Sequence, residues 1–149
     1  MYKHILVPTD GSKFAAKGIR EAAKLAKSLG AKLTGVYVVA PFAPQIYSEG
    51  AAYLGRAVSA KDYKALTEKE AKKALSAIER AARTAGVRFA GRIAIDAQPW
   101  KGILQIARAG RCDVIVMGSH GRSALRGLML GSETVRVLAR SNLPVLVAR

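Results

Sequence analysis

The sequence predicts an α/β fold, an open Rossmann-like sandwich in which helices cover both faces of a five-stranded parallel sheet. Short apolar runs alternate along the chain with longer segments whose apolar residues recur at helical spacing, an order typical of parallel sheets. The chain has 149 residues, of which 50% are hydrophobic, enough for one core. Since we find no internal repeat and no sign of a second domain, residues 1–149 are predicted to form a single domain.

The first three predicted elements lie within residues 4–39. His4–Pro8 is an apolar run of the kind that forms a strand covered on both faces. A helix follows "TDGS", with Ser12 as the predicted cap at its start and Gly30 at its end. Lys32–Val39 is predicted as the second strand. The apolar face expected for the helix consists of Ala15, Ile19, Ala22, Ala26 and Leu29.

A long loop and the clearest helix come next. Residues 40–60 contain two prolines and two glycines without any clear period, which predicts a long surface loop of the kind that is often functional. Residues 61–86 show sustained helical periodicity, and Gly86 is predicted to end the helix. The apolar face expected for this helix consists of Tyr63, Leu66, Ala71, Ala74, Ile78, Ala81 and Ala85.

The rest of the chain completes the alternation. Residues 87–95 alternate and predict a third strand, and residues 99–110 predict a helix whose first turn holds a proline. Residues 112–119 predict a fourth strand, residues 132–141 a short helix, and residues 143–149 a fifth strand. Ligands of parallel sheets bind beyond the carboxyl ends of the strands, so the loops "PTDGS" and "MGSHG" mark the expected binding edge.

Composition bounds the class of protein. The formal net charge of +15 attracts polyanions, but the basic residues are spread along the chain and form no DNA-binding arm. No apolar run approaches the ~20 residues of a membrane span, so we expect no membrane partner. The single cysteine, Cys112, excludes an internal disulfide, fits a reducing cytoplasmic interior and is expected to fill the core.

The glycine-rich loop "GSHGRSALRGLMLGSET", residues 118–134, carries the chemistry. It follows the apolar run "VIVM" and ends at a predicted helix start, where unpaired backbone N–H groups attract anions. Gly131 allows close approach, Ser132 and Thr134 add hydroxyl donors, and Arg122 and Arg126 lie in the arch. The spacing matches neither common phosphate-loop motif, so a tight strand exit followed by an ordinary helix cap remains the alternative.

The segment "MGSHGRSALRGLMLGS" fits G-x2-G-x9-G-[ST], and with it the chain resembles the ATP-binding branch of the universal stress protein family. The phrases "YKHILVPTDGS", "DVIVMGSHG" and "LARSNLPVLVAR" are also similar to that family. The resemblance covers the whole chain and is weakest in the long variable loop, residues 41–60. It implies a single universal stress protein domain with an adenine nucleotide alpha hydrolase-like sandwich, and homodimers that often form through the C-terminal strand.

The resemblance also implies ATP as the ligand and assigns roles to individual residues. The nucleotide is lined after the first strand by Pro8, Thr9 and Asp10. Around adenine and ribose, the matching residues are Val38, Met117 and Gly118. The phosphate cradle matches Gly121, Arg122, Gly131, Ser132 and Thr134.

Two acids need separate treatment. Asp10 is expected to contact the ribose or a phosphate-bound Mg²⁺, and the alternative is a turn and cap residue before Gly11. Glu133 suits the helix dipole but would oppose a triphosphate unless it points away or shares a cation, and we expect it to point away. His120 is expected to matter through backbone geometry, and Trp100 is too distant along the chain from the proposed site to predict a fluorescence signal.

Three functions follow from these observations. The favoured one is an ATP-binding stress or signalling protein that acts as a dimer. The alternative is a slow ATPase or autophosphorylating enzyme. Such an enzyme needs an activated water or acceptor beside the γ-phosphate, but only Asp10 and Glu133 are acids within predicted reach, and neither loop contains a lysine. A dedicated enzyme is therefore not expected. A nucleic-acid binder driven by the charge is a lesser alternative, because basic and aromatic residues do not interleave as in a stacking platform.

Overall fold

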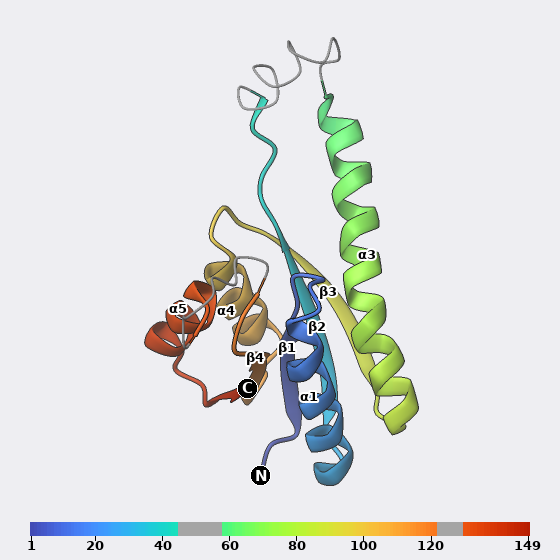
Figure 1. Ribbon diagram of the computed structural model, residues 1–149, viewed down its shortest axis with the longest axis vertical. Coiled ribbons are helices and arrows are strands. Elements are labelled where there is room, and N and C mark those ends of the chain that lie inside the picture. Colours follow the sequence, from blue (N-terminus) through green and yellow to red (C-terminus); the bar gives the residue numbers. More distant parts are fainter. Residues whose placement is uncertain (45–57, 122–129) are drawn as a thin grey trace.

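A computed structural model describes residues 1–44, 58–121 and 130–149. Its five strands form one parallel sheet in the order β3-β2-β1-β4-β5, which confirms the predicted five-stranded parallel sheet (Figure 1). The elements in chain order are β1 (His4–Pro8), α1 (Ala15–Leu29), β2 (Lys32–Val39), α3 (Ala60–Ala85), β3 (Phe89–Ile95), α4 (Pro99–Ala109), β4 (Val114–Gly118), α5 (Ser132–Arg140) and β5 (Val145–Ala148).

Helices cover both faces of the sheet, so the core has two halves. Successive side chains of a strand point to opposite faces, and in β1 Ile5 packs in the cluster under α1 and α3, whereas Leu6 packs in the cluster under α4 and α5. Cys112 is buried in the second cluster as predicted, and burial raises the pKa of its thiol to about 11. The thiol is therefore protonated at neutral pH and serves as core.

The helix ends test the predicted caps. Gly30 and Gly86 follow α1 and α3 with φ of 63° and 69°, so both predicted ends are confirmed. The prediction that Ser12 caps α1 is wrong, because the helix begins at Ala15 after Phe14 and has no side-chain cap. Residues 11–14 instead form a bend and turn that absorb the start of the predicted helix. Within the described residues the buried Ser12 hydroxyl has no hydrogen-bond partner.

The helix α3 is longer than the strands that it covers. Its 26 residues span about 39 Å, whereas the eight residues of β2 span about 26 Å. Its amino-terminal half therefore projects beyond the sheet, beside the chain that leaves β2 (Figure 1). Leu66, predicted to lie on the apolar face, is 58% exposed, because at five residues from Ala71 it lies about 140° around the helix from the buried face. The buried residues of α3 are Ala71, Ala74, Leu75, Ile78 and Ala82.

The sheet order places a crevice between β1 and β4. These strands are neighbours, but the chain leaves β1 for α1 on one face and β4 for α5 on the other. The connections that leave the carboxyl ends of the two strands therefore run to opposite faces of the sheet, as at other topological switch points. Close packing fixes this edge, because a Cβ on Gly18 of α1 would lie 2.4 Å from the backbone nitrogen of Gly118.

Candidate functional site

A cavity of about 410 Å³ opens at the carboxyl ends of β1, β2 and β4. It brings together residues from four separated segments of the chain, including eleven of the twelve site residues predicted from the sequence. The twelfth, Arg122, lies outside the described residues, as does Arg126. The predicted residues that line the cavity are Pro8, Thr9, Asp10, Val38, Met117, Gly118, Gly121, Gly131, Ser132, Glu133 and Thr134.

The exit from β1 is a tight turn held by its own side chains. Thr9 Oγ1 accepts a hydrogen bond from the Gly11 N–H at 3.1 Å, and Asp10 Oδ1 accepts one from the Ser12 N–H at 2.9 Å. Asp10 therefore acts as a turn residue, as its alternative role required. Its second oxygen, Oδ2, lies 2.5 Å from the position that a Cβ on Gly121 would take. The carboxylate is thus both anchored in the turn and directed at the glycine loop.

The exit from β4 is joined to the start of α5. The Gly131 N–H donates to the Ser119 carbonyl at 2.7 Å, and the Ser119 N–H donates to the Ala148 carbonyl at 2.9 Å. The buried Thr134 hydroxyl donates to the Gly118 carbonyl at 3.1 Å. The two ends of the 118–134 loop are therefore held together by the described residues. The Thr134 proton, predicted as a donor to phosphate, is used inside the protein.

The amino end of α5 faces the cavity. Gly131 stands at the N-cap position with φ of −68° and ψ of 151°, and no side chain caps the helix. The first N–H groups of a helix have no partner within the helix and carry a partial positive charge. Ser132, exposed in this first turn, adds a hydroxyl. This end of the cavity offers donors to an anion.

Glu133 lines the cavity but its carboxylate bonds to protein groups. Its Oε2 accepts a hydrogen bond from the Trp100 N–H at 2.9 Å, and its Oε1 accepts one from Arg136. Trp100 is the second residue of α4, which has Pro99 at its first position and no cap from its own N-cap side chain. Glu133 of α5 therefore serves as a tertiary cap for α4. The sequence gives no signal of this contact, because the two residues lie 33 positions apart.

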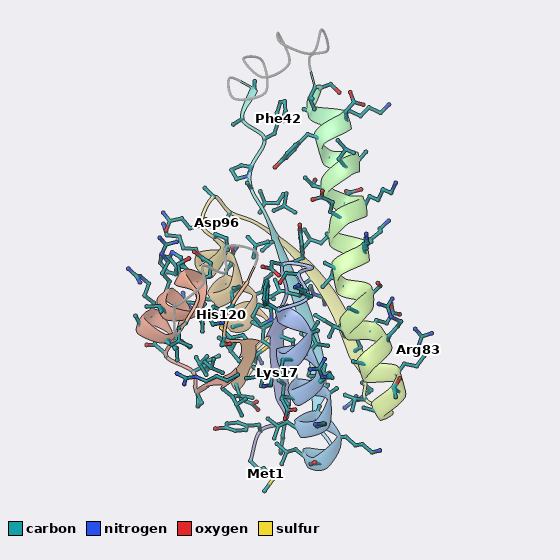
Figure 2. All side chains as sticks on the ribbon, in the orientation of Figure 1. Met1, Lys17, Phe42, Arg83, Asp96 and His120 are labelled. Carbon is teal, nitrogen blue, oxygen red and sulfur yellow. The ribbon has the colours of Figure 1, made fainter. Side chains whose placement is uncertain are left out.

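Five lining residues were missed in the sequence, and His120 was expected to matter through its backbone alone; the five are Ala15, Val36, Tyr37, Pro99 and Ile103. Val36 shares a strand face with Val38, and period-two alternation is the signal that identifies it. Pro99 and Ile103 come from α4, which begins at the same edge because it follows the carboxyl end of β3. His120 lies between α5 and α1 in the view of Figure 2, and its Nδ1 is 3.0 Å from the Ser119 hydroxyl.

The described lining combines apolar and charged side chains. Val38, Ile103 and Met117 supply apolar surface, whereas Asp10 and Glu133 are the charged side chains of the described lining. Since these described lining residues include no lysine or arginine, an anion here would be held by backbone N–H groups and hydroxyls. The described segments contain no group of three His, Cys, Asp or Glu residues able to hold a metal ion.

No helix among the described residues combines the length and apolar character needed to cross a membrane.

Comparison with known proteins adds a family to this geometry. A family model described as the universal stress protein family matches residues 1–149. Universal stress protein MJ0577 of Methanocaldococcus jannaschii is 33% identical over 157 residues, a match that covers 100% of this chain and 96% of that protein. Its solved structure superimposes with a TM-score of 0.75 and 30% identity, covering 99% of this chain and 96% of that one.

Two further solved structures share the fold. Universal stress protein UspA from Lactobacillus plantarum has a TM-score of 0.76 at 27% identity, covering 99% of this chain and 98% of its own. A universal stress protein from Archaeoglobus fulgidus in complex with dAMP has a TM-score of 0.69 at 23% identity, with 99% and 98% covered. At that identity the second likeness shows the fold alone.

Proposed function

Because this chain belongs to the universal stress protein family, we propose that it binds an adenine nucleotide in the cavity at the carboxyl ends of β1 and β4. The observation that carries the proposal is the convergence of eleven motif residues, from segments far apart in the sequence, on one cavity of about 410 Å³. That volume lies within the range of about 300–1,000 Å³ found for small-molecule sites. A relative with this fold is described in complex with dAMP, which supports the same ligand class here.

The chemistry of the lining fits the two halves of a nucleotide. Val38, Ile103 and Met117 offer apolar surface to a base. The uncapped amino end of α5 with the Ser132 hydroxyl offers donors to phosphate. We assign ATP as the nucleotide, with the Arg122 guanidinium assisting its phosphates.

Asp10 is assigned to the ribose or to a phosphate-bound Mg²⁺. One carboxylate oxygen is bound in the turn and the other faces Gly121, beside the proposed phosphate cradle. A hard oxygen ligand of this kind is what Mg²⁺ prefers, with phosphate oxygens and water completing its shell. When bound, the ion would neutralise phosphate charge near Asp10 and Glu133.

The second part of the proposal is a homodimer formed through β5. This strand lies at the edge of the sheet and, among the described residues, pairs with β4 alone. Leu146 of β5 is 41% exposed, and Val135 and Leu138 of α5 are 47% and 40% exposed nearby in the sequence. An apolar edge strand with free backbone groups is suited to pairing with a second copy across a two-fold axis.

The test of nucleotide binding is calorimetric titration of nucleotide-free protein with AMP, ADP and ATP, with and without Mg²⁺. The diagnostic variant is Ser132→Asp, whose added charge suits the first turn of α5 and so preserves the helix while it repels phosphate. Ser132→Asn is the matched neutral control. We expect saturable binding by the wild type and by Ser132→Asn, and binding at least about tenfold weaker in Ser132→Asp.

Two outcomes would contradict the proposal. One is a folded wild-type protein that binds none of the three nucleotides. The other is equal affinity in Ser132→Asp and Ser132→Asn. Slow ATP hydrolysis is tested by measuring phosphate release from the wild type and from Asp10→Asn. This variant keeps a carbonyl oxygen that accepts the Ser12 N–H, so it should retain the turn. Loss of hydrolysis with retained binding in Asp10→Asn would move the function toward an enzyme.

A further inference from the structure

A second cavity, of about 320 Å³, lies at the opposite edge of the sheet, where β1, β2 and β3 begin. It takes no part in the proposed nucleotide site, and His4 is its one lining residue that lies within a sequence phrase discussed above. Both cavities lie on the face covered by α4. Pro99 and Ile103, near the start of this helix, line the first cavity, whereas Ile106, Ala109 and Gly110, at its end, line the second.

Strand alternation places the polar residues of this cavity on one face. His4 of β1 stands opposite Lys32 of β2, and Thr34 stands opposite Ala90 of β3. Because side chains two residues apart share a face, Arg88 and Arg92 flank Ala90 on this same face of the sheet. The short side chains of Ala90, Ala109 and Gly110 leave the space that the longer residues surround.

The floor of the cavity is polar and deeply buried. His4 is 7% exposed and Thr34 is 6% exposed, and His4 Nε2 lies 2.7 Å from Thr34 Oγ1. The Asp113 carboxylate, which follows Gly110 closely in the chain, accepts hydrogen bonds from the backbone N–H groups of Lys3 and His4. Asp113 does not line the cavity. The polar floor thus faces a space whose described lining contains no acid.

The walls carry three positive charges. Lys32, Arg88 and Arg92 line the cavity, and none of them takes part in the three ion pairs found among the described residues. Burial and, after it, the Lys32 charge lower the pKa of His4, so the charge of the walls reaches the floor. Hydrogen bonds to the Gly110 and Arg111 carbonyls and the Asp113 charge raise this pKa by less. The three side chains are exposed, and Arg92 Nη1 donates to the Gly91 carbonyl at 3.1 Å. Like charges around one cavity, with no acid in its described lining, favour an anion.

We propose that this cavity is a second ligand site, for a compact oxyanion of the phosphate class, held by Lys32, Arg88 and Arg92 above the His4–Thr34 floor. Two guanidinium groups and one ammonium group match the geometry and charge of a phosphate group. The volume, near the lower end of that known for ligand sites, limits the occupant to a small molecule. The site is independent of the nucleotide site and does not rest on it.

The two histidines of the chain provide a separate reporter for each cavity, since His4 lines the second and His120 lines the first. The experiment is an NMR titration of protein labelled at histidine, at pH 7.5 and constant ionic strength, with inorganic phosphate in place of chloride. We expect a saturable shift of the His4 ring signals, and a higher His4 pKa in phosphate because the anion offsets the Lys32 charge.

The variants separate a site from general screening. Arg92→Gln should weaken the phosphate response of His4 by about fivefold or more, as the loss of a charge-assisted hydrogen bond predicts. Arg83→Gln is the matched control, because Arg83 projects from α3 away from the sheet (Figure 2) and should leave the response unchanged. A parallel titration with glycerol 2-phosphate compares the affinity of the cavity for a phosphorylated small molecule with its affinity for free phosphate. The tighter-binding compound identifies the preferred kind of ligand.

Three results would overturn the proposal. These are a His4 signal that phosphate does not move, a shift that grows without saturation as for screening alone, and equal weakening by Arg92→Gln and Arg83→Gln. The proposed function fails differently, since its failure leaves His120 unmoved by ATP whatever His4 does in phosphate.

Discussion

Glu133 shows how a single contact changes the interpretation of a residue. In the sequence it stands in the first turn of a helix beside a phosphate cradle, where its charge suits the helix dipole but opposes ATP unless it points away or shares a cation. In the structure its carboxylate accepts the Trp100 N–H of α4 and pairs with Arg136. Its charge is thereby shared between the amino ends of two helices and a cation, all of which favour an anion at that position.

Replacing Glu133 by Gln removes this charge but keeps an acceptor for Trp100. We expect the free energy of unfolding in urea to fall by about 1 kcal/mol, the scale of a lost charge at helix amino ends. Mg²⁺-free ATP should bind no more weakly, because one negative charge beside the phosphates is gone. Glu68→Gln is the control, since its pair with Lys64 at 3.9 Å is exposed and should contribute less than 0.5 kcal/mol, the scale known for such pairs. Equal losses in both variants would refute the capping role.

His4 makes stability depend on pH. Burial and Lys32 lower its pKa from the ordinary value of 6.5 in the folded state, so below pH 6.5 the unfolded chain binds the proton more readily. Stability contributed by neutral His4 is present above pH 6.5 and is lost as the pH falls toward the folded-state pKa. The slope from one proton cannot exceed about 1.4 kcal/mol per pH unit.

The measurement is the free energy of unfolding between pH 7.5 and 5.5 in chloride, for the wild type and for His4→Gln. The wild type should lose stability over this interval more steeply than the variant does. Identical slopes would mean that His4 titrates alike in both states.

At the scale of elements, the site edge depends on how closely α1 approaches β4. A Cβ on Gly18 would meet backbone atoms, Gly118 N at 2.4 Å and Met117 C at 2.7 Å, which cannot rotate away. Alanine normally stabilises a helix interior relative to glycine by about 0.5–1 kcal/mol. Here we expect the opposite sign, a loss of at least about 2 kcal/mol as α1 is pushed from the sheet.

Gly18→Ala is compared with Gly30→Ala, for which the added Cβ meets nothing within 4 Å but φ is 63°. That control should cost only the backbone strain, about 1 kcal/mol. Thermal and urea unfolding of both variants give the comparison. A stabilised Gly18→Ala protein would show that the close approach is not required.

The same scale shows what period and spacing can and cannot predict. Apolar recurrence located every strand and helix of the described chain, because burial on a sheet or helix face requires it. The prediction that Leu66 belongs to the buried face is wrong, because its spacing of five residues from Ala71 places it on the opposite side of α3. The pattern also predicted a helix cap at Ser12. A serine before an apolar helical face gives the same pattern whether the helix begins directly after it or only after a turn.

At the scale of the molecule, the sequence predicted the residues of the cavity better than their bonds. The parallel topology placed the two loops at one edge, and the family resemblance assigned Asp10, Gly121 and Gly131 to one site, where they line the same cavity. Contacts between elements distant in the chain, such as Glu133 with α4, follow from tertiary packing and leave no local pattern. The basic cavity at the amino edge was not predicted for the same reason, because Lys32 belongs to β2, whereas Arg88 lies just before β3 and Arg92 within it.

The proposed dimer is tested at this scale. Leu146→Lys places a charge on the apolar edge strand β5 and should shift the protein toward the monomer in sedimentation velocity, with the fold retained because Leu146 is 41% exposed. Leu66→Lys is the matched control on the projecting part of α3, where the side chain is 58% exposed. A Leu146→Lys protein that sediments like the wild type and the control would exclude β5 as the interface.

The contact between α4 and α5 also makes the molecule its own optical probe. The ring centroid of Trp100, the single tryptophan, lies 4.7 Å from the Arg140 guanidinium carbon and 5.5 Å from Lys101 Nζ. Its backbone N–H donates a hydrogen bond to Glu133, which lines the cavity. Indole emission is sensitive to nearby charge, so movement of the first turn of α5 should alter its colour or intensity. Titration with ATP should therefore change the intrinsic fluorescence without any label, and Trp100→Phe should abolish the signal while binding persists in the calorimeter.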